Sequence, residues 1–298
     1  MANSTIKRYI WLLNILKQRH RLTFNEISNL WDRSSLNDDG KPLVLRTFHN
    51  HREGIDKLFG IKIECDISTN EYYISSNDDL RDDATNRWLY NSFAISNMIA
   101  AGHSMKDRIL YEDIPGGVEF TQVVVEAMQQ NMVLRIDYKR FGSQQFVVHL
   151  HPYAMKMYNH RWYVVGHREE NNQLRVIALD RVIAMEITDR HFALPENFDA
   201  ASYYANSVGI FVSESAQPQR VVVRAYGIHA DYLRTLPLHH SQKEIAVKEW
   251  CCDFEYSLSL TPELTTQLLA MGEDIEVIMP EALRDEMRKK IIGMFSRY

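Results

Sequence analysis

The chain has 298 residues, of which 45% are hydrophobic and 24% are charged, and its formal net charge at pH 7 is −5. This composition indicates an ordinary globular protein of about two or three domains, and it excludes a disordered or fibrous chain. The longest apolar runs are shorter than the ~20 residues that a membrane helix needs, so we expect no membrane among its partners. Cys65, Cys251 and Cys252 have no metal-ligand spacing, which favours a reducing, cytoplasmic location.

The net charge hides a modest segregation along the chain. Residues 1–75 carry a small excess of basic groups, whereas residues 191–298 carry most of the negative charge. A protein this close to neutrality would have to gather its few cations on one face in order to bind DNA.

Three helices are predicted within residues 1–60. Apolar residues recur at helical spacing from Ile6 to Leu16 and give a first helix of about three turns. The segment "TFNE" at 23–26 is a capping box that begins a second helix, which buries Trp31. A third helix, "RTFHNHREGIDKLFG", ends at Gly60 in the C′ position.

A β-hairpin follows the third helix. The alternating residues Ile61, Ile63, Cys65 and Ile67 predict one strand, and Tyr72, Tyr73 and Ile74 return after a turn at 68–70. Three short helices followed by a hairpin are typical of a winged helix-turn-helix, which we assign to residues 1–76. In that architecture the third helix enters the major groove and the hairpin touches the DNA backbone.

The third helix carries a polar face opposite its apolar one. Arginine and asparagine can each make two hydrogen bonds to a base edge, and basic side chains also bind phosphate. The candidate DNA-binding residues are Arg46, Thr47, His49, Asn50, Arg52 and Lys57, of which Arg52 and Lys57 are assigned to phosphate. The alternative is a solvated helix face, which any surface helix has. The order of the elements and the mix of residue types favour DNA.

Residues 77–117 are expected to form a helical linker. The segment begins with the acidic run "NDDLRDDATN", and Trp88, Phe93, Ile95 and Met98 suit a helical hairpin or a linker helix. Pro115, Gly116 and Gly117 then interrupt the chain, and a short helix at about 118–130 follows.

From residue 132 the hydrophobic period changes from that of a helix to that of a strand. The segments "VLRIDYKRF", "QFVVHLHPYAMKMY", "RWYVVGH" and "LRVIALDRVIAMEIT" are typical of strands joined by short turns. About five short strands connected this closely can bury an inner face only by curling into a small barrel, which we place at residues 118–200.

Three segments of this region, "HPY" at 151–153, "RWYVVG" at 161–166 and "RVIALDRV" at 175–182, resemble the WYL domain, a family named for its Trp-Tyr-Leu strand. The resemblance runs through residues 120–190, and the flanking regions are similar in order to those of WYL proteins. The chain departs from the pattern at Val164, where the family has leucine, and at the Asn159-His160 turn, where glycine is more usual. The first exchange keeps an apolar side chain, and asparagine accepts left-handed geometry.

The resemblance implies a bacterial transcription regulator, commonly a homodimer, in which an Sm-like barrel senses a nucleotide or a nucleic-acid-derived ligand. It points to His151, Tyr153, Arg161, Tyr163, Arg175 and Arg181 as the ligand-binding residues. Their chemistry supports this reading, because arginine offers a planar fork for phosphate and an aromatic ring offers a base a surface for stacking.

Strand alternation divides the named motif between two faces. Arg161, Tyr163 and His167 share one face, which leaves Trp162 and Val164 on the other. We therefore expect Trp162 in the core and Tyr163 as a stacking surface for the ligand.

Two alternatives apply to the same region. Asp180 could form a purely structural ion pair with its neighbour Arg181. His149 and His151 could suggest a metal, but no cysteine or carboxylate lies at ligand spacing, so we expect no metal and no other cofactor.

Residues 201–298 follow the order βαββαβα, which predicts a ferredoxin-like α/β sandwich. Gly272 is expected to end one helix, and Pro280 is expected to begin the next. This tail resembles the C-terminal extension of WYL proteins, and its acid content argues against a DNA surface, so we expect it to close over ligand or to form dimer contacts. His239 and His240 lie in a polar loop and are expected to be exposed.

The prediction is an α+β multidomain regulator, not an enzyme, that binds a double-stranded DNA operator as a homodimer. Its barrel would bind a small nucleotide or a short single-stranded nucleic acid and alter operator binding. The alternative is a nucleic-acid-processing or defence-associated enzyme, or an accessory module, with the barrel as its substrate or single-strand site. The sequence has no paired-carboxylate metal motif, no GxSxG elbow and no P-loop, so no catalytic residue is assigned.

Overall fold

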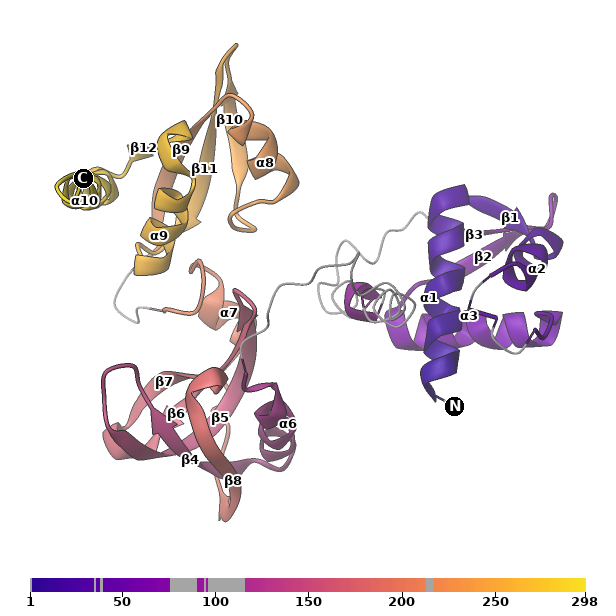
Figure 1. The fold of residues 1–298 in the computed structure, drawn as a ribbon, viewed down its shortest axis with the longest axis horizontal. Helices are drawn as coiled ribbons and strands as arrows, with labels where there is room; N and C mark the ends of the chain where they lie inside the picture. The colour runs from indigo at the N-terminus through magenta and orange to yellow at the C-terminus, as the bar shows by residue number, and fades with distance from the viewer. Residues whose placement is uncertain are drawn as a thin grey trace. The chain divides into compact units, whose positions relative to one another are not determined.

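Figure 1 shows the protein as a computed structural model, which describes residues 2–34, 36–37, 40–75, 90–93, 95, 116–212 and 217–298. The chain divides into two compact units, residues 1–112 and residues 113–298. Among the described helices, none is both long enough and apolar enough to cross a bilayer.

The first unit combines helices with a small antiparallel sheet (Figure 1). Its elements are α1 (Ala2–Arg19), β1 (Arg21–Thr23), α2 (Phe24–Asp32), α3 (Leu45–Phe59), β2 (Ile63–Asp66) and β3 (Glu71–Ile74). The predicted helices and hairpin are confirmed, although α1 is longer than three turns. The strand β1, which makes the sheet three-stranded in the order β1-β3-β2, was not predicted, because three residues are too few to show alternation.

The apolar faces of the helices meet in one core. Phe48, Ile55 and Phe59 of α3 are buried there, together with Trp31 of α2, as the helical spacing predicts. The hairpin departs from its prediction at Ile67, which lies in the turn with 89% of its surface exposed rather than in the strand.

The predicted capping box begins α2. The Thr23 hydroxyl accepts a hydrogen bond from the Glu26 amide at 3.4 Å, and the Glu26 carboxylate accepts one from the Thr23 amide at 2.8 Å. This second bond is the main reason that the pKa of Glu26 lies below its ordinary value.

Most of the predicted helical linker, including Trp88 and Met98, lies outside the described residues. Residues 90–93 and 95 are helical, and Tyr90 is buried in the core of the first unit, where its hydroxyl hydrogen-bonds to Asn14. The ring centroid of Phe93 lies 6.2 Å from that of Phe59.

The second unit begins with a helical segment and a five-stranded antiparallel sheet, in the order β7-β6-β5-β4-β8 (Figure 1). The elements are η2 (Val118–Phe120), α6 (Thr121–Gln130), β4 (Met132–Lys139), β5 (Gln145–Tyr158), β6 (Arg161–Arg168), η3 (Glu169–Asn171), β7 (Gln173–Ala178), η4 (Leu179–Arg181) and β8 (Val182–His191). Asn159 and His160 join β5 to β6 with φ angles of 46° and 61°. Two successive left-handed residues are the signature of a tight type I′ hairpin, so the turn forms without glycine.

The two faces of this sheet are both covered. On one face, Val124 and Ala127 of α6 pack against Leu134 and Val164, and Trp162 is partly buried against the same core, as predicted. On the other face, Tyr163 was expected to be exposed as a stacking surface, but only 7% of it is.

Residues that follow the sheet cover this second face. Phe192 is buried there and stacks on His151 of β5, and the Lys156 ammonium of β5 donates a hydrogen bond to the carbonyl of Gly209. The sequence pattern of the strands could not show this cover, because the covering residues lie beyond β8.

The remainder follows the predicted βαββαβα order, after α7 (Ala200–Tyr204). The elements are β9 (Gln219–Tyr226), α8 (His229–Thr235), β10 (Lys243–Val247), β11 (Cys251–Leu258), α9 (Pro262–Ala270), η5 (Gly272–Asp274), β12 (Ile275–Met279) and α10 (Glu281–Phe295). The sheet order is β10-β11-β9-β12, and every neighbouring pair is antiparallel.

The helices of this part share one core with one face of its sheet. The opposite face carries paired charges: Arg224 makes two hydrogen bonds to Asp253, at 2.7 and 3.0 Å. His239 is half-buried rather than exposed, and burial lowers the pKa of its imidazole to about 4.

Candidate functional site

A pocket of about 550 Å³ opens beside the turn that joins β5 to β6. Its lining residues are Tyr158, Asn159, His160, Arg161, Tyr163, Arg181, Ile210 and Glu263. They come from the hairpin, from η4, from the connection after α7 and from the first turn of α9. A volume of this size falls in the range of about 300–1,000 Å³ that small-molecule sites occupy.

The two arginines of the pocket have different surroundings. The Arg161 Nε lies 3.5 Å from the Asp180 carboxylate, whose side chain is 10% exposed. The Arg181 guanidinium lies 4.2 Å from the ring centroid of Phe141, and its Nε is buried without a hydrogen-bond partner among the described residues. Asp180 therefore pairs with Arg161 across η4 rather than with its neighbour, and it balances one of the two positive charges.

Gly117 sets the position of η4. A Cβ atom at this residue would lie 2.4 Å from the backbone carbon of Leu179 and 2.6 Å from the Asp180 nitrogen. Its φ of +98° also suits glycine alone. This close approach holds the turn that carries Asp180 and Arg181 against the start of η2.

Glu263 enters the pocket from α9. It follows Pro262 in the first turn of the helix, whose N-cap Thr261 accepts a hydrogen bond from the Leu264 amide at 3.2 Å. A carboxylate is favoured at this position by the positive end of the helix dipole. Its Oε2 is buried and has no hydrogen-bond partner among the described residues.

Gly209 lies close to both Glu263 and Tyr158. A Cβ atom at Gly209 would lie 2.9 Å from the Glu263 Cγ and 3.1 Å from the Tyr158 ring, and the φ of Gly209 is +86°. The Tyr158 hydroxyl accepts a hydrogen bond at 3.0 Å from Gln267, one turn further along α9.

A half-buried lysine, Lys156, lies close to Gly209 and Glu263. The Lys156 ammonium lies 4.0 Å from the ring centroid of Tyr204. Burial lowers the pKa of Lys156, and the negative charge of Glu263 partly opposes that shift. Burial also raises the pKa of Tyr204 well above its usual range.

Three of the six ligand-binding candidates, His151, Tyr153 and Arg175, are not among the lining residues of this pocket. His151 pairs with His167, six residues along β6 from Arg161, which is roughly 20 Å along a strand. The Tyr153 ring lies 5.0 Å from that of Phe198. Arg175 is exposed and donates to the neighbouring carbonyl of Leu174 at 3.1 Å.

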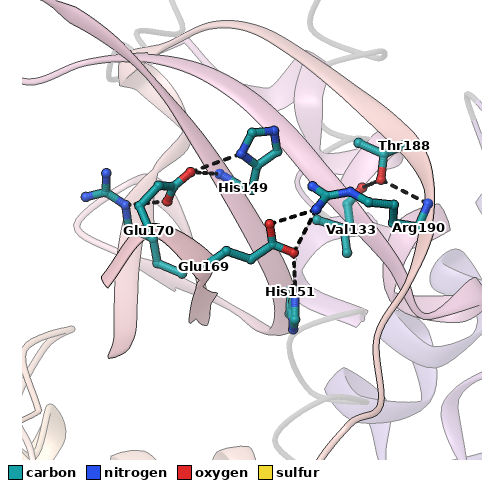
Figure 2. A network of polar contacts seen from close by, with 8 residues as sticks. Val133, His149, His151, Glu169, Glu170, Thr188 and Arg190 are labelled. Carbon is teal, nitrogen blue, oxygen red and sulfur yellow. Dashed lines mark hydrogen bonds and ion pairs between the residues drawn. The ribbon is translucent and has the colours of Figure 1, made fainter. Parts of the chain in front are cut away.

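His151 belongs instead to a polar network around η3 (Figure 2). Figure 2 shows the Glu169 carboxylate between Arg190, at 2.9 Å, and the His151 Nε2, at 3.0 Å. Burial raises the pKa of Glu169, but the hydrogen bonds from His151 and Arg190 outweigh it and hold the pKa below its ordinary value. His151 also stacks on Phe192, with ring centroids 5.0 Å apart.

Glu170, in the same view, also lies between an arginine and a histidine, here Arg168 and His149. Its carboxylate accepts hydrogen bonds from Arg168 at 2.8 Å and from the His149 amide at 2.7 Å. Sequence reasoning missed both glutamates, and the only local signal was a pair of acids in a turn next to basic strand residues. Among the described residues, no group of three or more His, Cys, Asp or Glu side chains is placed to hold a metal ion.

The polar face of α3 is the second candidate site. Arg46, His49, Asn50 and Lys57 are exposed, and Thr47 is half-buried. These residues share one accessible surface of a single helix.

Arg52 differs from the other α3 candidates. Its Nε donates to the backbone carbonyl of Ile63 at 3.0 Å, and its guanidinium lies 5.0 Å from the Tyr72 ring centroid. A further nitrogen of the guanidinium lies 3.3 Å from the His49 Nδ1. Arg52 therefore ties α3 to the hairpin.

A groove of about 420 Å³ separates the later part of α3 from β2. Its lining residues are His49, Arg52, Glu53, Asp56, Lys62, Ile63 and Glu64. Three of these are carboxylates, so the groove is unfavourable for phosphate. Arg46 and Asn50, exposed in the first two turns of α3, do not line this groove.

Comparison with known families bears on the second unit. Residues 119–187 match the WYL domain family. The chain therefore contains a WYL domain. Residues 217–294 match a second family, the WCX domain. The pocket therefore combines the WYL residues Arg161, Tyr163 and Arg181 with Glu263 of the WCX domain.

Two solved structures are similar to this WYL-domain protein. Proteasome accessory factor B/C (PafBC) of Arthrobacter aurescens is 17% identical, with a TM-score of 0.35 over 96% of this chain and 46% of that one. A CRISPR Cas-related protein is 12% identical, with a TM-score of 0.37 over 59% of this chain and 50% of that one. The chain thus spans about half the length of these structures, and likeness at this level says nothing about function. None of the curated proteins matches the chain.

Proposed function

We propose that the protein is a DNA-binding transcriptional regulator whose WYL domain binds a nucleotide or a short single-stranded nucleic acid. In this proposal a homodimer binds a double-stranded operator, and effector binding alters that contact. The chain would comprise a winged helix-turn-helix (1–76), a helical linker (77–117), an Sm-like barrel (118–200) and a ferredoxin-like sandwich (201–298).

The order of the elements supports these assignments. Three helices precede a hairpin in the first unit, one helix precedes five antiparallel strands in the WYL region, and the last part has the strand order β10-β11-β9-β12. Arg46 and Asn50, which are exposed in the first two turns of α3, are residue types that suit base edges.

One observation carries the effector half of the proposal. Arg161, Arg181 and Tyr163 line the same pocket, and the buried Nε of Arg181 has no hydrogen-bond partner among the described residues. A phosphate would supply the missing acceptor, because arginine binds phosphate through two parallel hydrogen bonds.

The pocket also suggests how binding could be transmitted. Its walls come from the WYL hairpin and from α9 of the WCX domain, so a ligand that touches both favours one arrangement of these elements. An effector shifts operator binding only to the extent that it prefers one arrangement over another.

The test measures binding of the four ribonucleoside 5′-monophosphates, and of a 5′-phosphorylated tetranucleotide of random sequence, to the full chain by calorimetry. We expect at least one of them to bind, and we expect Arg161→Ala with Arg181→Ala to weaken it at least tenfold. Arg161→Lys with Arg181→Lys keeps the charges without the planar fork and should weaken it less.

Arg175→Ala is the matched control, since it removes an exposed arginine of the same sheet that does not line the pocket. Absence of binding by every probe, or an equal loss in Arg175→Ala, would contradict the proposal. Melting curves of each variant establish that it is folded.

A further inference from the structure

Among the described residues that line the pocket, Glu263 is the only carboxylate. Its Oε2 is buried and has no hydrogen-bond partner among the described residues. A buried acceptor without a donor costs free energy, and most buried polar atoms in proteins are satisfied. The atom therefore needs an explanation.

Two neighbouring features favour a negative charge on Glu263, but neither gives its Oε2 a hydrogen-bond donor. The first turn of α9 stabilises a negative charge through the helix dipole. The Lys156 ammonium attracts the carboxylate, but it donates its hydrogen bond to the Gly209 carbonyl and lies over the Tyr204 ring. Neither feature supplies a donor to Oε2.

The Glu263 side chain lines the pocket, so a ligand bound there would lie next to it. Its Cγ and the Tyr158 ring both lie close to Gly209. The Tyr158 hydroxyl is itself bonded to Gln267 of the same helix, so the wall and the carboxylate are fixed together.

An ionised carboxylate only accepts hydrogen bonds, and its two oxygens match a ligand that offers two adjacent N–H donors. Guanine offers such a pair on its Watson–Crick edge, the ring N1–H and the exocyclic N2 amino group. Adenine, cytosine and uracil each place a donor beside an acceptor, and that acceptor would face the second carboxylate oxygen.

We infer that the pocket selects a guanine nucleotide, with Glu263 accepting from the guanine edge while Arg161 and Arg181 bind the 5′ phosphate. This inference rests on the proposed nucleotide-binding function and adds the identity of the base. The shared chemistry is a guanine with a 5′ phosphate, whether as a free nucleotide or at the end of a short strand. Glu263 is the residue that sets specificity.

The inference also explains why the pocket needs residues from two domains. The phosphate-binding arginines lie in the WYL domain and Glu263 lies in the WCX domain. A guanine nucleotide would bridge them, whereas phosphate alone would engage only the WYL side.

The experiment compares guanosine, inosine and adenosine 5′-monophosphate by calorimetry on the full chain. Inosine monophosphate lacks only the N2 amino group, so it should bind about tenfold more weakly than guanosine monophosphate, because it loses one of two hydrogen bonds to a charged group. Adenosine monophosphate loses both and places an acceptor against the carboxylate, so it should bind roughly a hundredfold more weakly.

The decisive variant is Glu263→Gln. Glutamine offers one acceptor and one donor, which suits adenine, so the preference for guanine over adenine should fall at least tenfold. The matched control is Glu281→Gln, an exposed first-turn glutamate of α10 outside the pocket, which should keep the wild-type order.

The outcomes separate the two proposals. Equal affinity of the wild-type protein for the three nucleotides overturns base selection and leaves nucleotide binding intact. Selection that survives unchanged in a folded Glu263→Gln protein overturns the role of Glu263. Failure of all three nucleotides to bind overturns this inference. If the pyrimidine nucleotides and the tetranucleotide also fail, the proposed function is overturned with it.

Discussion

The polar face of α3 and the pocket beside the β5–β6 turn differ in how many parts of the chain build them. All the candidates on α3 lie within one 15-residue helix, and their exposure follows directly from helical spacing. The pocket gathers residues from four segments between Tyr158 and Glu263. A site on one element can be located from periodicity, whereas a site between elements is only partly visible in any one of them.

The largest effect expected on the helix side is the loss of operator preference in the double variant Arg46→Ala, Asn50→Ala. Each bidentate contact to a base is worth about 1–3 kcal/mol, so the pair should cost about 2–6 kcal/mol of discrimination between operator and scrambled DNA. Fluorescence anisotropy with both duplexes measures it. Nucleotide binding in the pocket should be unchanged, because the two sites share no residue.

Lys57→Ala sharpens this test. A phosphate contact carries no sequence information, so this variant should lower the affinity for operator and scrambled DNA alike. The slope of log affinity against log salt concentration should also become smaller by about one. If Lys57→Ala changes the preference while the double variant does not, the assignment of roles on α3 is wrong.

His51, on the buried face of the same helix, should make the free energy of unfolding depend on pH, by about 2–3 kcal/mol between pH 7 and pH 4. His51 is 8% exposed, and burial, assisted by the charge of Arg8, lowers the pKa of its imidazole from 6.5 to about 4. Between pH 6.5 and pH 4 the His51 imidazole is therefore protonated in the unfolded state but remains neutral in the folded state, so acid favours unfolding. Stability of the first unit should be full above pH 6.5 and should fall as the pH drops toward 4.

Urea denaturation between pH 4 and pH 7, followed by tryptophan fluorescence, measures this effect. His51→Phe should remove that part of the pH dependence, whereas His49→Gln, at an exposed position of the same helix, should retain it. The same pH dependence in both variants would show that His51 is not its source.

The pocket side is probed by a residue that does not line it. Gly209→Ala introduces a Cβ atom 2.9 Å from the Glu263 Cγ and also strains a left-handed backbone, at a total cost of about 1–3 kcal/mol. We expect nucleotide affinity to fall at least tenfold because Glu263 and Tyr158 must move. Gly272→Ala carries a comparable backbone strain, with a φ of +71° and nothing within 4 Å, and should keep nucleotide affinity.

The smallest effect should be confined to one helix end. Thr23→Ala removes the capping box and should lower the stability of the first unit by about 1 kcal/mol, as typical N-cap substitutions do. A thermal melt detects the loss, and calorimetry should show unaltered nucleotide binding. A change in nucleotide affinity would mean that the two units are coupled more strongly than their separate cores indicate.

Local patterns predicted most of the helices and strands. The capping box at Thr23, the left-handed Gly60 after α3 and the strand alternation through β5 all express local preferences that later packing leaves in place. The misses, β1 and the exposed Ile67, occur where an element is too short for its period to be measured.

The candidate site was predicted only in part. Strand alternation places Arg161 and Tyr163 on one face, but it cannot show that Ile210 and Glu263 complete the pocket. Nothing in the sequence around Glu263 distinguishes it from an ordinary first-turn glutamate. Burial of Tyr163 was missed for the same reason, since residues beyond β8 pack against β5, the neighbouring strand.

The bond from Arg52 to the Ile63 carbonyl has a consequence for sequence variation. The guanidinium binds a main-chain oxygen, which is present whatever side chain occupies position 63. In a randomised library selected for folding, position 63 should drift among apolar residues, while arginine persists at the half-exposed position 52. Retention of arginine at a partly solvated helix position would resemble selection for DNA contact. Its cause would instead be structural, because the hydrogen bond from Arg52 keeps α3 and the hairpin together.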